Sequence, residues 1–229
     1  IDYIGPFTPI TRRRRCRYII LAIDYATKWV EARATAKDDA ETSARFLYEQ
    51  IFTRFGPPLE LVSDRGTHFI NETVEKLTSR YLVKHRRTTP YHPKANGMTE
   101  RANGIIGKIL NKTVAAHKTD WDEKLYTAIY SYNLAFKTTT GHSPYFLVFG
   151  QHSLVPVEFE IHTPRVSLHT RLPETESSSD RTFQLEVLEE SRLLAARHIA
   201  KKQEATKKQH DKGLHRVDVK TGDLVLLYD

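Results

Sequence analysis

The chain has 229 residues, with 35 Lys and Arg against 28 Asp and Glu, so its formal net charge is +7 and its pI is about 9.4. Its one cysteine, Cys16, excludes an internal disulfide framework and a cysteine-built zinc site, and no apolar run reaches the ~20 residues that span a bilayer. The 39% of hydrophobic residues predicts a packed core, and the positive charge favours an anionic partner such as nucleic acid, although a merely basic soluble enzyme would have the same composition.

The first part of the chain alternates short apolar runs with amphipathic segments. Residues 17–24 are β-branched and apolar, which is typical of a buried strand, and residues 28–34 alternate as a hairpin partner would. Asp38 or Asp39 can cap a helix whose apolar residues recur at helical spacing. Further strands are predicted at residues 1–4, 59–63 and 83–87, and further helices at residues 71–80, 99–117 and 121–136. This order predicts a mixed sheet covered by helices, an α/β layer architecture.

The composition changes after residues 1–150, which are expected to form the first domain. Residues 151–179 contain Pro and Ser with little periodicity and are interpreted as a linker. Residues 180–213 are dense in Glu, Lys, Arg, Leu and Ala, which predicts one long helix with a basic second half. Residues 214–229 indicate a turn leading into a strand, where a small β domain is expected to begin. Because both ends lie in predicted strands, the chain is expected to be part of a longer polypeptide.

Two acidic residues stand at element ends, where a fold can bring them together. Asp64 follows the strand at residues 59–63, and Glu100 opens a helix after the Pro-, Asn- and Gly-rich loop at residues 89–97. Moving a phosphodiester requires charge to be neutralised on two oxygens, which divalent ions held by carboxylates achieve. Either residue alone is equally typical of a helix cap or an acidic first turn. Three apolar residues of the helix are predicted to face the core, on the side away from Glu100: Ile105, Ile106 and Ile109.

The spacing of this pair decides between these interpretations. The 35 residues between Asp64 and Glu100 resemble the D,D-35-E signature of retroviral and retrotransposon integrases. Residues 63–69 resemble the family's S-D-x-G-x-x-F block, and residues 91–103 resemble its Y-H-P-x-x-N-G-x-x-E-R-x-N block. Further blocks resemble the gypsy-type LTR retrotransposon branch, at residues 2–7, 24–29, 143–150 and 222–225. The resemblance covers nearly the whole chain.

The resemblance implies an RNase H-like α/β fold, a mixed five-stranded sheet flanked by helices, in residues 1–150. The long basic helix would follow, and then the start of a small SH3-like β domain. It also implies that Asp2, Asp64 and Glu100 are the catalytic residues and hold two Mg²⁺ (or Mn²⁺) ions. Asp2 occupies the family's first-strand position, and Asp24, which ends the next strand, is the alternative.

The implied activity is that of a Mg-dependent DNA integrase, which trims the 3′ ends of the element's DNA and joins them to target DNA. Its partners would be double-stranded DNA, both element ends and target, and further copies of the same chain, with no membrane. It would be produced within a cytoplasmic polyprotein and act in the nucleus. Two alternatives remain: a domesticated, catalytically silent DNA-binding protein derived from an integrase, and an RNase H-type hydrolase.

The resemblance also implies which side chains touch nucleic acid. The loop before Glu100 and the helix after it contact DNA in similar integrases, and the matching residues here are Tyr91, Asn96, Asn103 and Lys108. Basic residues elsewhere can either face solvent or contact phosphates: Arg12, Arg13, Arg14, Arg15, Lys201 and Lys202.

Overall fold

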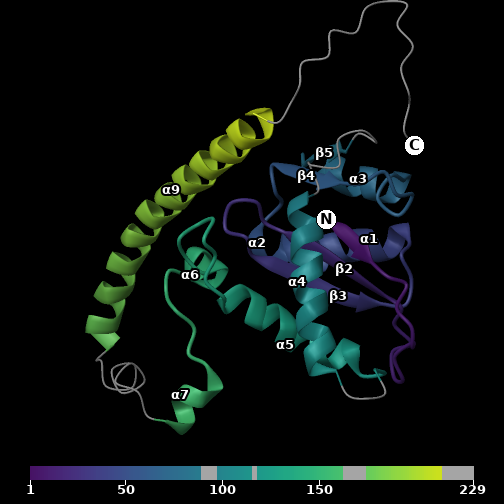
Figure 1. Cartoon of the computed structure of the whole chain (residues 1–229), viewed down its shortest axis with the longest axis horizontal. Helices are drawn as coiled ribbons and strands as arrows, with labels where there is room; N and C mark the ends of the chain where they lie inside the picture. Colours follow the sequence, from purple (N-terminus) through teal and green to yellow (C-terminus); the bar gives the residue numbers. More distant parts are fainter. Residues whose placement is uncertain (89–96, 115–117, 162–173, 213–229) are drawn as a thin grey trace, which may run out of the picture.

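Two groups of strands form the centre of the molecule (Figure 1). The computed structural model describes residues 1–88, 97–114, 118–161 and 174–212. Three strands pair antiparallel in the order β1-β2-β3, and β4 and β5 pair parallel. The strands are β1 (Asp2–Ile4), β2 (Tyr18–Ile23), β3 (Val30–Thr35), β4 (Glu60–Ser63) and β5 (Lys84–Arg87).

The two groups meet where β1 lies beside β4. The amino nitrogen of Ile1 donates to the carbonyl oxygen of Val62 at 2.8 Å. Ile1 and Leu61 also belong to one buried cluster that includes Ile20 of β2 and Val83 before β5. The strands thus form two small sheets, β1-β2-β3 and β4-β5, whose neighbouring edges are joined through Ile1, in place of the one hydrogen-bonded sheet of five strands that the resemblance implied.

Both faces of β2 are covered, which explains its uninterrupted apolar sequence. Ile19 and Leu21 belong to the core on one face, and Ile20 belongs to the core on the other. The second face carries the first group of helices and the π-helical turn between them: α1 (Ala40–Phe46), η1 (Leu47–Phe52), α2 (Thr53–Phe55) and α3 (Glu72–Arg80). Asp39 caps α1, since its Oδ1 accepts from the Thr42 amide at 2.9 Å.

The first face carries α4 (Gly97–Thr113) and α5 (Trp121–Leu134), which pack on β2 and β3. The side of α4 that faces the core contains Thr99, Ala102, Ile106 and Leu110. The prediction for Ile105 is wrong, because this side chain is 38% exposed. Smaller residues, Thr99 and Ala102, take part of the core face instead.

In the described residues after the sheet domain, three further helices follow: α6 (Pro144–Phe149), α7 (Pro156–Glu160) and α9 (Glu174–Lys212). The helix α9 begins at Glu174, inside the predicted linker, because neither Pro nor Gly interrupts the sequence from there. The helix α7 also lies within that linker. The predicted β domain at residues 214–229 lies outside the described residues.

The long helix α9 packs along one side of the domain, against α6 (Figure 1). It buries Leu188 and Ala195, which are 3% and 2% exposed. Two of its arginines donate to the last carbonyl oxygens of α6: Arg192 Nε to Leu147 at 2.8 Å, and Arg181 Nη2 to Phe149 at 2.8 Å. Across the described segments, no helix combines the length and the apolar character needed to cross a membrane.

Candidate active site

Asp2 and Asp64 meet because their strands are neighbours. Asp2 opens β1, Asp64 directly follows β4, and the bond from Ile1 to Val62 sets these two strand ends side by side. Burial raises the pKa of the Asp2 carboxyl, a hydrogen bond from the Tyr3 amide lowers it, and the negative charge of Asp64 raises it again. The two carboxyl groups therefore repel each other when both are ionised, as acidic residues that share a site do.

The Asp2 carboxylate is held by groups from two elements. Its Oδ1 accepts from the Tyr3 amide at 2.9 Å, and its Oδ2 accepts from Asn103 Nδ2 of α4 at 2.9 Å. The Asn103 Oδ1 is buried and has no hydrogen-bond partner among the described residues. Asn103, which the resemblance assigned to DNA contact, thus orients a carboxylate in the structure.

The Asp64 carboxylate sits in a tight turn. Its Oδ1 accepts from the Gly66 amide at 3.0 Å and lies 3.7 Å from His68 Nε2. A Cβ added at Gly66 would lie 2.3 Å from the His68 imidazole, so a larger residue there would require this ring to move. The His68 ring packs edge-on against Tyr3, with ring centroids 4.7 Å apart. Sequence reasoning did not assign His68 to the site, because no local motif marks this contact.

Glu100 stands apart from the two aspartates. It lies exposed in the first turn of α4, one turn before Asn103. Within the residues that the structure describes, no three His, Cys, Asp or Glu side chains are close enough to hold a metal ion. The structure therefore brings Asp2 and Asp64 together but not Glu100.

Asp24 serves a different purpose from Asp2. Its Oδ2 accepts from the Thr27 amide at 2.8 Å and from the Thr27 hydroxyl at 2.6 Å. These bonds fold the turn between β2 and β3. This arrangement favours Asp2 over Asp24 as the first carboxylate.

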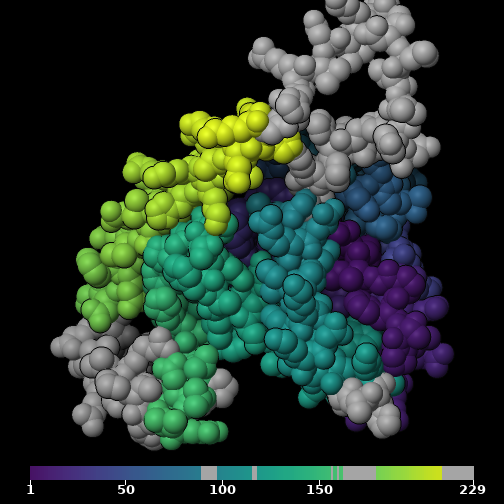
Figure 2. All heavy atoms as spheres, viewed as in Figure 1, coloured from purple at the N-terminus to yellow at the C-terminus, as the bar shows by residue number. Residues whose placement is uncertain are grey.

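The exposed side of α4 is open on the face drawn in Figure 2. Glu100, Gly104 and Lys108 recur at helical spacing, and Lys108 is exposed. A Cβ added at Gly104 or Gly107 would meet nothing within 4 Å. The space beside Gly104 and Gly107 thus lets an extended molecule approach this side of α4. Tyr91 and Asn96 lie outside the described residues.

The predicted basic residues lie away from the carboxylates. The exposed run Arg12–Arg15 follows the end of β1 opposite Asp2, and its Arg12 amide donates to the Thr119 carbonyl oxygen near α5 at 3.2 Å. Lys201 and Lys202 are exposed on α9.

A cavity of about 560 Å³ is lined by residues of β2, of β4 and of the turn between β2 and β3. Trp29, Phe55, Val148 and Arg192 are among the residues that line it. None of the three predicted carboxylates does. This cavity is therefore separate from the predicted carboxylates.

Residues 2–93 match the family described as "Integrase core domain". The chain is 26% identical over 231 residues to the retrovirus-related Pol polyprotein from transposon 412 of Drosophila melanogaster, covering 99% of this chain and 18% of that protein. It is 30% identical over 160 residues to the Pol polyprotein of Radiation murine leukemia virus (strain Kaplan), covering 69% of this chain and 26% of that protein. The chain thus spans about a quarter or less of the length of these relatives.

The fold is similar to that of a solved integrase assembly. The simian T-cell lymphotropic virus intasome in complex with PP2A regulatory subunit B56 gamma superposes with a TM-score of 0.50 at 20% identity. The match covers 68% of this chain and 50% of that chain, and it supports the RNase H-like fold. The family match and the relatives agree with each other, and together they support a retroviral-like LTR integrase catalytic core in this chain.

Proposed function

We propose that the chain is the catalytic part of a DNA integrase. This polynucleotidyl transferase would trim the 3′ ends of an element's double-stranded DNA and join them to target DNA. The observation that carries the proposal is the pairing of Asp2 and Asp64 at adjacent strand ends in a chain that matches the integrase core domain. A pure binding module has no need of two acids that repel each other and also repel DNA.

The carboxylates fit divalent metal ions. Burial and the charge of Asp64 both disfavour the ionised form of Asp2, and a cation would relieve both effects. Mg²⁺ prefers oxygen ligands, so Asp2 and Asp64 would hold the metal, with Glu100 of α4 as the third ligand. Two bound ions, Mg²⁺ or Mn²⁺, stabilise charge on the attacking and leaving oxygens of a phosphodiester.

The other residues of the site prepare these ligands. Asn103 fixes one oxygen of Asp2, and the Gly66 amide fixes one oxygen of Asp64, so neither carboxylate must be ordered during the reaction. Lys108, on the open side of α4, would meet a DNA phosphate and position the duplex without reading its sequence. Tyr91 and Asn96 are proposed to contact the DNA end as well.

The integrase would work as an assembly of several copies in the nucleus. Joining two element ends to one target requires two active sites, so we expect a homo-oligomer on DNA. The chain would be released from a polyprotein and act on chromosomal DNA in the nucleus. Release from a polyprotein is supported by the relatives, which are named as Pol polyproteins.

The test is a strand-transfer assay on the full-length protein with Mg²⁺ and a duplex that carries the element's end. Asp64→Asn keeps the size of the side chain and should abolish the joined product. Asp38→Asn, which removes an exposed carboxylate away from the pair, should leave it unchanged. Joined product that persists in Asp64→Asn would overturn the mechanism. Metal-independent DNA binding without joining by the wild-type protein would favour the silent DNA-binding alternative, and cleavage of an RNA–DNA hybrid would favour the hydrolase.

A further inference from the structure

Lys28 occupies an unusual position for a lysine. Its side chain is buried, at 5% exposure, and its backbone has a φ of +65°, in the left-handed region that favours glycine. Both features disfavour lysine in the turn between β2 and β3. A lysine that is both buried and held at a positive φ is expected to have a specific role.

The Lys28 ammonium group points at the start of α4. Its Nζ donates to the carbonyl oxygen of Tyr25 in the same turn and lies 3.2 Å from Met98 Sδ. Met98 belongs to the first turn of α4 and precedes Glu100 by two positions. The ammonium therefore links the β2–β3 turn to the backbone segment that carries the third predicted carboxylate.

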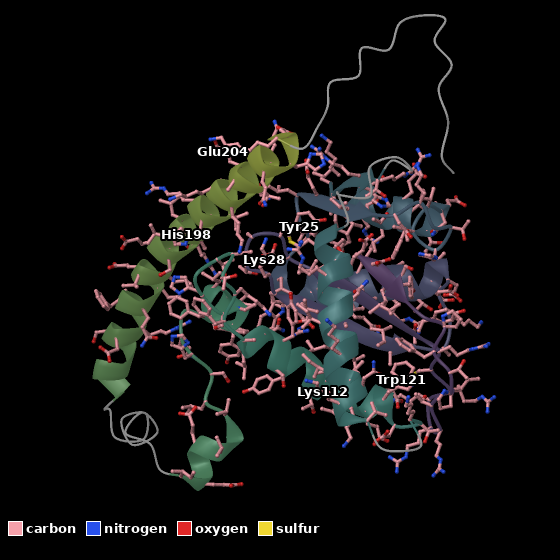
Figure 3. All side chains as sticks on the ribbon, in the orientation of Figure 1. Tyr25, Lys28, Lys112, Trp121, His198 and Glu204 are labelled. Atoms are coloured by element: carbon pink, nitrogen blue, oxygen red, sulfur yellow. The ribbon has the colours of Figure 1, made fainter. Side chains whose placement is uncertain are left out.

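Tyr25 makes a second link from the same turn. Burial raises the pKa of the Tyr25 hydroxyl and the side chain of Thr99 lowers it, so Tyr25 is a neighbour of the fully buried residue directly before Glu100. Figure 3 shows Tyr25 and Lys28 together beside the upper end of α4. The β2–β3 turn thus reaches both residues that precede Glu100, with Lys28 beside Met98 and Tyr25 beside Thr99.

The turn itself is well fixed. Asp24 accepts from the Thr27 amide and hydroxyl, and the Lys28 amide donates to the Asp24 carbonyl oxygen at 2.9 Å. A rigid turn that contacts the start of α4 limits where the helix can begin. The position of Glu100 relative to Asp2 and Asp64 then depends on this contact.

We propose that Lys28 and Tyr25 are positioning residues of the active site, which hold the first turn of α4 and so set the distance from Glu100 to the Asp2–Asp64 pair. The inference rests on the proposed function, in which Glu100 is a metal ligand. Neither residue touches the reacting atoms. Lys28 is too buried to serve as a phosphate contact in this arrangement.

The decisive variant is Lys28→Gly, because glycine accepts the φ of this turn while the ammonium is lost. We expect its thermal unfolding midpoint to equal or exceed that of the wild type. The Mg²⁺ concentration for half-maximal strand transfer should rise about tenfold, as for the loss of a group that orients a metal ligand. The rate at saturating Mg²⁺ should largely recover, and amide hydrogen exchange at residues 98–103 should become faster.

Two further variants sharpen the test. Lys37→Met removes an exposed lysine, with 78% of its side chain accessible, and should match the wild type in every measurement. Tyr25→Phe removes only the hydroxyl group and should shift the Mg²⁺ requirement in the same direction as Lys28→Gly. It keeps the inference testable if Lys28→Gly does not fold.

The outcomes separate this inference from the proposed function. If Asp64→Asn is inactive while Lys28→Gly and Tyr25→Phe match Lys37→Met in Mg²⁺ requirement and in exchange, the positioning role is wrong and the proposed function stands. A lower unfolding midpoint with an unchanged Mg²⁺ requirement would likewise mean that Lys28 only stabilises the fold. If Asp64→Asn remains active, the proposed function itself fails.

Discussion

Asn133 is expected to be among the most sensitive polar residues of the fold. It is 2% exposed on α5, and its side-chain amide forms two hydrogen bonds with β3: Nδ2 donates to the Val30 carbonyl oxygen at 3.0 Å, and Oδ1 accepts from the Val30 amide at 2.9 Å. The strand β3 is the outer strand of its group, so the amide supplies the partner that a further strand would supply. Val30 also begins β3 directly after the Lys28 turn.

The variant Asn133→Leu keeps most of the side-chain volume and removes both bonds. The amide and carbonyl of Val30, a residue with no exposed surface, would then be buried without partners. Each such group costs about 1–3 kcal/mol, so the free energy of unfolding should fall by roughly 3–4 kcal/mol. Urea denaturation measures this change, with Asn111→Leu on the exposed side of α4 as the control. A loss below about 1 kcal/mol at an unchanged m-value would refute the reasoning.

The remaining predictions concern the Asp2 carboxylate and the contact of α9 with α6. Because folding raises the pKa of Asp2, ionisation of this group destabilises the folded state as the pH rises through that pKa. Asp2→Asn should therefore abolish strand transfer but unfold at a higher temperature than the wild type at pH 7. This difference in unfolding temperature should vanish at pH values below the ordinary carboxyl pKa of about 4. An unchanged difference across this pH range would contradict this cause. Arg192→Met removes the donor to the Leu147 carbonyl oxygen, so limited proteolysis should cleave α9 several-fold faster while the sheet domain unfolds as before; equal cleavage rates would show that this contact does not hold α9.

Sequence patterns predicted the strands and helices that are determined by residues close together in the chain. The apolar run of β2 marked a strand covered on both faces, and Asp39 caps α1 by the short-range bond that its residue type favours. The pairing of Asp2 with Asp64 could be anticipated only through the family resemblance, because no local pattern states that β1 lies beside β4. That adjacency depends on contacts between segments sixty residues apart, such as the bond from Ile1 to Val62.

The parts that sequence reasoning missed depend on three-dimensional neighbours. His68 next to Asp64 and Lys28 next to Met98 have no motif that marks their contact. Ile105 was expected in the core because of its apolar character, but it is partly exposed, and Thr99 and Ala102 are among the residues on the core face of α4. Apolar periodicity thus predicted the helix correctly and one of its buried residues incorrectly.

The central claim is that Asp2, Asp64 and Glu100 form one metal site. It is tested most directly by anomalous diffraction from a crystal of the protein soaked in Mn²⁺. We expect anomalous peaks between Asp2 and Asp64, with the Glu100 carboxylate drawn into the coordination sphere and Asp24 still in its turn. A peak that Asp24 ligates in place of Asp2, or no peak beside Asp64 at saturating Mn²⁺, would contradict the assignment of these carboxylates.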